Sequence, residues 1–283
     1  DHLLLNNGRF IPHQPCRTGV VVDGETAWFA CAMLPWTDSF LCAVDAETGT
    51  TTAKHHFVRT LPGLTMEGAP ALSSKVLVLP QGRVAPRMFD RLTGEDKGEM
   101  VKSGGGSVVV VSLDDSVLHG PATDSRKGGF RQSSGQSREV IAGLGRGNAL
   151  VVDGDTSWML TDTEIVASSL TKRTVLWKAA CDCPFTMIKA GDTLFVGGDQ
   201  NVAAHSATTG KLLWQQPANG RVFGLAAANG RLFASSDTGA IHCYAQNGRM
   251  PHQADTAISK QQKPTAIANL TPTKHPALLG HWA

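Results

Sequence analysis

Several polar side chains of the sequence could meet around a common axis and bind a small ligand there. The set combines one carboxylate, one guanidinium and one imidazole with three uncharged polar groups, a mixture that suits a sugar, a carboxylate or a cofactor. A lone carboxylate does not make a general acid–base pair without a second group within reach, so we assign no catalytic residue. The alternative is that the charged members are solvated at the rim of the fold. The candidates are Glu67, Arg83, Ser107, His119, Asn148 and Thr186.

The cysteines are the second source of chemistry. Cys31 and Cys42 could face each other across a hairpin and form a disulfide, or they could be buried free thiols. Cys181 and Cys183 flank a single Asp, but zinc sites usually combine two such knuckles at wider spacing. We therefore predict no metal site.

Composition excludes two classes of partner. The formal net charge is +2, and no run of Lys and Arg is interleaved with stacking aromatics, so we predict no nucleic-acid partner. No apolar stretch approaches the roughly 20 residues that a membrane helix requires, so we predict no membrane span.

The elements that must position these side chains come from an internal repeat. Apolar runs end in a glycine turn at Gly154, Gly191 and Gly230, at intervals of 37 and 39 positions. Each period holds four short strands; in the clearest copy they are 185–189, 193–196, 202–205 and 212–215. Four antiparallel strands in about 40 residues make one blade of a β-propeller. The sequence predicts an all-β propeller with six visible blades, at 18–60, 64–103, 106–143, 147–180, 184–219 and 222–248.

The remaining segments are predicted to connect this propeller to other parts of a longer protein. Residues 1–17 resemble a connector from an upstream blade, and the chain starts at Asp1 rather than at Met. Residues 249–283 are predicted to be a linker and the possible start of a further domain. Within the third blade, the polar stretch 124–138 is expected to be a long excursion between strands.

The repeat also has a recognisable consensus. The phrase Ala207-Thr208-Thr209-Gly210-Lys211-Leu212-Leu213-Trp214 resembles the outer-strand signature of PQQ-like repeats, found in quinoprotein alcohol dehydrogenases and in an outer-membrane assembly lipoprotein. Shorter matches occur at 46–49, 171–177 and 237–244. The resemblance implies an eight-bladed propeller and a periplasmic or extracellular location. It also implies that Trp177 and Trp214 pack between blades.

The resemblance leaves two functions open. A quinoprotein dehydrogenase of this family carries adjacent, disulfide-linked cysteines and a Glu-Asn-Asp calcium set, and neither can be matched here; Cys181-Asp182-Cys183 departs from the pattern. We therefore expect no cofactor, with PQQ and calcium as the alternative. The favoured hypothesis is a non-catalytic, monomeric scaffold that binds a protein or carbohydrate ligand at its loops. Trp36 is the candidate for an exposed binding aromatic.

Overall fold

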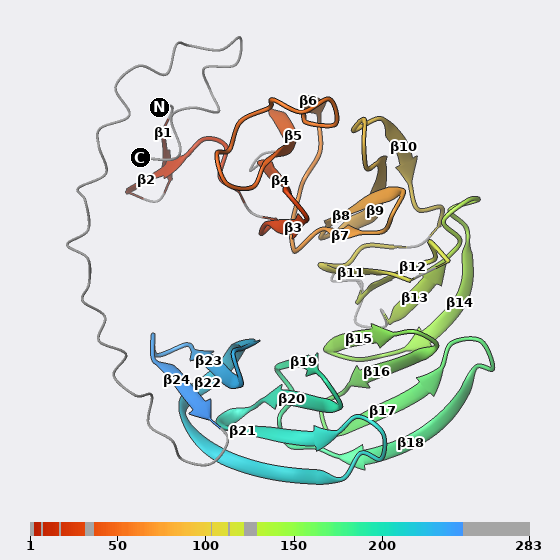
Figure 1. Cartoon of the computed structure of the whole chain (residues 1–283), viewed down its shortest axis with the longest axis vertical. Coiled ribbons are helices and arrows are strands. Elements are labelled where there is room, and N and C mark those ends of the chain that lie inside the picture. The colour runs from red at the N-terminus through yellow and green to blue at the C-terminus, as the bar shows by residue number, and fades with distance from the viewer. Residues whose placement is uncertain are drawn as a thin grey trace.

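The computed structural model describes residues 3–6, 8–16, 18–31, 37–102, 104–112, 114–121 and 129–245. Its regular elements are all β-strands, which confirms the predicted all-β class. The strands form antiparallel meanders that follow one another in an arc, with the chain running through it from red to blue (Figure 1). The chain therefore folds as a β-propeller. Trp36, predicted to be an exposed aromatic, lies outside the described residues.

Four sheets have four strands each and a fifth has six; the four-stranded sheets and the first four strands of the six-stranded sheet match the first five predicted blades. In each of them the strands pair in chain order. Blade one comprises β3 (Val21–Asp23), β4 (Thr26–Cys31), β5 (Asp38–Asp45) and β6 (Phe57–Pro62), and blade two comprises β7 (Ala71–Leu72), β8 (Val76–Gln81), β9 (Val84–Asp90) and β10 (Asp96–Glu99). Blade three comprises β11 (Val108–Val111), β12 (Val117–Gly120), β13 (Phe130–Ser133) and β14 (Val140–Gly145), and blade four comprises β15 (Ala149–Asp153), β16 (Thr156–Leu160), β17 (Glu164–Ser169) and β18 (Thr174–Ala180). Blade five comprises β19 (Thr186–Ala190), β20 (Thr193–Gly197), β21 (Asp199–Ser206) and the first part of β22 (Leu212–Ala228).

Blade six shares a strand with blade five. The first part of β22 pairs with β21, and residues 222–228 of the same strand pair with β23 (Arg231–Ser236), which pairs with β24 (Ile241–Ala245). Three strands of blade six are therefore described. Residues 246–248, the end of the predicted span of this blade, lie outside the described residues.

One expectation needs correction. The stretch 124–138 is not one long excursion, because Phe130–Ser133 is β13, paired with both β12 and β14. Phe130 is only 1% exposed, so its apolar side chain holds this otherwise polar strand in the core of the blade. The leading segment also carries structure of its own: β1 (Leu3–Asn6) and β2 (Arg9–Pro12) form a two-stranded hairpin.

Two Thr-Gly turns, Thr93-Gly94 and Thr209-Gly210, each pack against an aromatic ring of the preceding blade. Gly94 and Gly210 both have positive φ, at 66° and 74°. A Cβ added at Gly94 would lie 2.5 Å from the Phe57 ring of blade one, and one at Gly210 would lie 2.6 Å from the Trp177 ring of blade four. Glycine is needed here for the backbone conformation and for the close approach of an aromatic ring.

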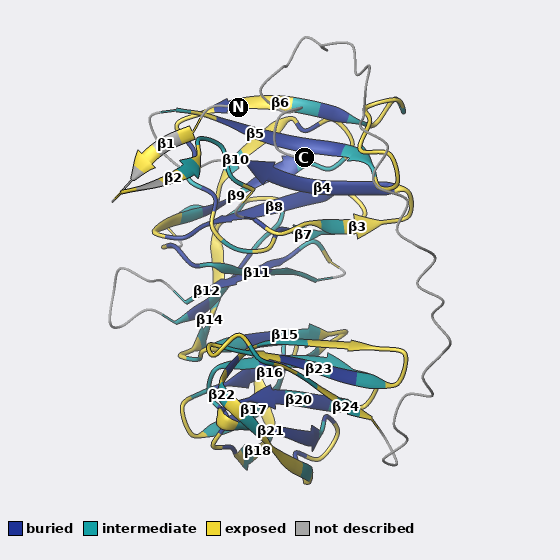
Figure 2. Cartoon of the chain, turned by 90° about the vertical axis from the view of Figure 1, so that its left-hand side faces the viewer, coloured by how far each residue is buried: buried dark blue, intermediate teal, exposed yellow. Residues whose placement is uncertain are grey.

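Tryptophans on the second strand of a blade also bind that blade to the next one. Trp28 donates its indole N–H to the carbonyl oxygen of Arg91 at 3.3 Å, and Trp158 donates to that of Ala207 at 2.9 Å. Each bond joins one blade to the next, so both tryptophans contribute to packing between blades. Figure 2 shows the result: β4 and β8 are buried along their length, whereas β3 and the β1–β2 hairpin carry exposed residues.

Candidate functional site

The structure divides the six predicted axis residues into groups on different blades. Glu67 forms an isolated parallel bridge with Gln81, and its carboxylate lies against Gly82. The exposed Arg83 follows directly, and its backbone lies against Gly105. Ser107 approaches this group from blade three, because its carbonyl oxygen lies against Gly68. Blades two and three thus meet through glycines and backbone, which leaves little side-chain volume between them.

Asn148 and Thr186 belong to the junction of blades four and five. The Asn148 side-chain amide donates to Asp162 Oδ1 at 2.9 Å and to the carbonyl oxygen of Pro184 at 3.0 Å. Thr186 begins β19, and its methyl group lies against Gly197. Asn148 therefore ties a loop of blade four to the segment that enters blade five, a positioning role that ligand binding would interrupt.

His119 lies in the interior of blade three. Its side chain is 1% exposed, Nε2 lies 3.1 Å from Ser133 Oγ, and Nδ1 has no hydrogen-bond partner. Burial, helped by the positive charge of Arg131, lowers the pKa of His119 to about 4. The imidazole is thus a neutral part of the blade, and it presents no surface to a ligand.

Because His119 is buried and neutral, we expect the stability of the protein to depend on pH. The folded state keeps His119 neutral down to pH about 4, whereas the unfolded chain takes up a proton near the ordinary value of 6.5. The unfolded state therefore binds more protons in this window, and the free energy of unfolding should fall on the order of 3 kcal/mol between pH 7 and pH 4. His119→Gln should lose this part of the pH dependence in urea titrations. Parallel pH profiles for the two proteins would contradict the assignment.

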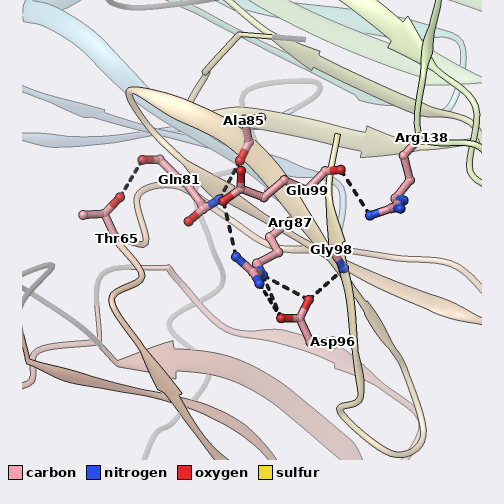
Figure 3. Close-up of polar contacts among 8 residues, drawn as sticks. All are labelled: Thr65, Gln81, Ala85, Arg87, Asp96, Gly98, Glu99 and Arg138. Atoms are coloured by element: carbon pink, nitrogen blue, oxygen red, sulfur yellow. Dashed lines mark hydrogen bonds and ion pairs between the residues drawn. The ribbon is translucent and has the colours of Figure 1, made fainter. Parts of the chain in front are cut away.

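A dense polar network in blade two holds strands together rather than offering a site (Figure 3). Arg87 binds Asp96 through Nε at 3.0 and 2.9 Å, and it binds Glu99 Oε1 through Nη1 at 3.3 Å. Burial alone would raise the pKa of Asp96, but the bond from Arg87 holds that pKa below its usual value. Arg138 of blade three reaches the carbonyl oxygen of Glu99. The charges are matched within the network, so little remains for an outside ligand.

Two kinds of feature are absent from the described part of the chain. It holds no group of three or more His, Cys, Asp or Glu side chains that could bind a metal ion. Nor does it contain a helix of the length and apolarity needed to cross a membrane.

A groove with a volume of about 880 Å³ lies between blades five and six. Three aromatic rings line this groove side by side. The ring centroid of Trp214 lies 6.0 Å from that of Phe195 and 5.9 Å from that of Tyr244. Tyr244 donates its hydroxyl to the carbonyl oxygen of Pro217 at 2.8 Å, and burial raises its pKa. Arg231 lines the same groove and is half-buried. The arrangement is an aromatic wall with one cation beside it.

The groove runs beside a strand edge. Among the described residues, β24 pairs only with β23, and Ile241 on β24 is 74% exposed. The alternating exposure of 241–245 shows that one face of β24 packs against the blade and the other faces solvent. Cys243, Tyr244 and Ala245 of this strand also line the groove. Chemically, the site can offer apolar surface and backbone hydrogen bonds together.

Sequence reasoning missed this groove because it assigned Trp214 wholly to packing. Trp214 does contact blade six, but it stays partly exposed and forms one wall. Tyr244, the single tyrosine of the chain, was the available signal. A smaller hollow of about 320 Å³ between blades three and four is lined by Arg146, Glu164 and Arg173. There Glu164 is already paired with Lys178 at 3.1 Å.

Comparisons with known proteins agree with the repeat. The family model described as outer membrane protein assembly factor BamB matches residues 161–273. BamB from Moraxella catarrhalis has a similar structure, with a TM-score of 0.58, 16% identity, and coverage of 88% of this chain and 87% of that chain. The WD40 propeller domain of Doa1 gives a TM-score of 0.59 at 13% identity, over 81% and 78% of the two chains.

A chain from the mitotic checkpoint complex gives a TM-score of 0.59 at 13% identity, over 79% of this chain and 72% of that chain. No curated protein sequence matches significantly. At these identities the structural matches show the propeller fold alone, and the BamB family model adds the type of repeat. The chain is a β-propeller whose residues 161–273 match the PQQ-like repeat family.

Proposed function

We propose that this protein is a non-catalytic binding scaffold whose ligand is an extended polypeptide segment. The segment would add as a strand to the edge of β24 and place apolar side chains against Trp214 and Tyr244. The observation that carries the proposal is the position of an aromatic groove directly beside a strand edge. Strand addition gives affinity through backbone hydrogen bonds, and a neighbouring pocket gives specificity through alternate side chains.

Further support comes from the matching family, whose name describes an assembly factor. We extend to this chain the role of binding other proteins, an extracytoplasmic location and a monomeric state. We also propose that it works without PQQ or calcium. The axis residues Glu67, Arg83 and Ser107 remain a secondary candidate for a small polar ligand, since Arg83 and Glu67 are exposed.

The test is a selection of random peptides on the full chain, followed by affinity measurements with the peptides obtained. Trp214→Ala and Tyr244→Ala should each weaken binding at least 10-fold, because central aromatic residues of an interface commonly contribute about 2 kcal/mol or more. Phe223→Ala is the matched control, since Phe223 is an exposed aromatic on β22 that does not line the groove.

Two further arms separate the alternatives. A panel of oligosaccharides tests the carbohydrate ligand; groove-dependent binding of a glycan but of no peptide would replace the polypeptide by a sugar. PQQ with Ca²⁺ tests the dehydrogenase, and a stable quinone absorbance with substrate-dependent reduction would overturn the scaffold. We expect neither result.

A further inference from the structure

Cys16 and Cys31 are placed as opposite members of an antiparallel bridge. Cys16 lies in the segment that follows the β1–β2 hairpin, and Cys31 ends β4 in blade one. The two residues exchange no backbone hydrogen bond with each other. They therefore occupy a non-hydrogen-bonded position, where the Cα atoms of opposite residues come to about 4.5 Å. That separation falls within the range of about 4.4–6.8 Å that disulfides span.

The side chains of the two bridged residues also interact electrostatically. The neighbouring Cys31 thiol is the main reason that the pKa of Cys16 is lowered to about 6. The same interaction, together with burial, raises the pKa of Cys31. Two residues further on, Thr18 fixes the segment, because its hydroxyl accepts the Ala30 N–H at 2.9 Å. Both sulfurs are thus held at one place on blade one.

The two thiols differ in solvent exposure, as stepwise disulfide formation with an outside disulfide requires. Cys16 is exposed, whereas Cys31 is only 7% exposed. An exposed thiolate can attack an outside disulfide, and a buried neighbour can then displace the outside thiol. Cys42, which the sequence offered as a possible partner of Cys31, is less well placed. In the β4–β5 register Cys31 lies opposite Phe40 and Cys42 opposite Phe29, so the two cysteines are only diagonal neighbours.

We propose that Cys16 and Cys31 form a disulfide that fastens the leading segment, residues 3–16, to blade one. The Cys16 thiolate attacks a low-molecular-weight disulfide, forms a mixed disulfide and releases one thiolate. Cys31 then attacks the Cys16 sulfur, releases the second thiolate and passes its proton to it. Two protein thiols are oxidised, and the outside disulfide is reduced to two thiols. The cross-link is independent of the groove proposed as the binding site.

The experiment uses the full chain, reduced and then incubated with oxidised glutathione. Remaining thiols are alkylated and the protein is digested with trypsin without reduction. Cleavage after Arg9, Arg17 and Lys54 places Cys16 in peptide 10–17 and both Cys31 and Cys42 in peptide 18–54. We expect these two peptides to be joined and two of the six thiols to escape alkylation.

Single variants assign the bond. Cys42→Ser should retain the cross-link, whereas Cys31→Ser and Cys16→Ser should lose it. Full alkylation of Cys16 in the wild-type protein after glutathione treatment would overturn the proposal. So would a cross-link that persists in Cys31→Ser and disappears in Cys42→Ser, because that result would pair Cys16 with Cys42. Alkylation after unfolding of a never-oxidised sample gives the count of six for reference.

Discussion

Gly68→Ala is expected to lower the free energy of unfolding by about 4 kcal/mol, by combining backbone strain with overpacking. Gly68 has a φ of 110°, a conformation that residues with a Cβ rarely adopt. An added Cβ would overlap the carbonyl oxygen of Ser107 in the next blade. Backbone atoms cannot move aside as a flexible side chain can, so the junction of blades two and three must open.

Gly24→Ala is the matched control for this variant. Gly24 also has positive φ, at 60°, but an added Cβ would meet nothing within 4 Å. It should cost only the backbone strain, about 1 kcal/mol. Urea unfolding of both variants measures the difference. Equal losses would show that blades two and three do not approach each other closely at Gly68.

Trp158→Ala is expected to lower the free energy of unfolding by a similar amount, about 4 kcal/mol, because a large buried ring is replaced by a cavity. Trp158 is 5% exposed and belongs to the core shared by blades four and five. Its N–H bond to the Ala207 carbonyl oxygen is buried, and Lys189 Nζ lies 5.6 Å from its ring centroid. The side chain therefore joins the two blades through packing and one hydrogen bond.

Trp158→Phe separates these two contributions. A phenyl ring fills much of the space but cannot donate to Ala207, so the loss should be smaller, about 1–2 kcal/mol. Thermal and urea unfolding check both variants. If the alanine and phenylalanine variants were equally stable, the packing of Trp158 between the blades would contribute little, and the account of the blade junction would be wrong.

The strands of blade five could be predicted from the sequence because their turns carry local signals. Gly191 and Gly210 take positive φ at the expected turns, and β19 and β20 lie within one residue of the predicted spans. Turn chemistry depends on a few adjacent residues, so a single sequence is enough. The same reasoning was available for Asn7-Gly8 in the leading segment, where β1 and β2 form a hairpin that was not predicted.

Pairing between distant segments could not be predicted in this way. The stretch Pro217-Ala218-Asn219-Gly220 carries the signals of a strand end, yet β22 continues through it with Gly220 at a φ of 86°. Pairing of Pro217 with Asn201 and of Arg221 with Asp199, both on β21, carries the strand past these breakers. Continuous strands of this kind depend on tertiary contacts, which override local preference.

The candidate sites likewise depend partly on local sequence and partly on tertiary packing. The sequence identified polar residues near the first strands, but burial decides their role, as the interior position of His119 shows. The aromatic groove depends on the spacing of blades five and six, which no local pattern encodes. Its members Phe195 and Tyr244 are almost 50 positions apart and come from different blades.

We propose that ligands bind at the edge of β24 and in the adjoining groove. Amide hydrogen exchange of the full chain, with and without a selected peptide, tests it most directly, because strand addition protects edge amides from exchange. We predict slower exchange across 241–245 and in the groove turn at 227–231. Unchanged exchange there, with protection at 67–83 and 105–107 instead, would place binding at the propeller axis and contradict the account.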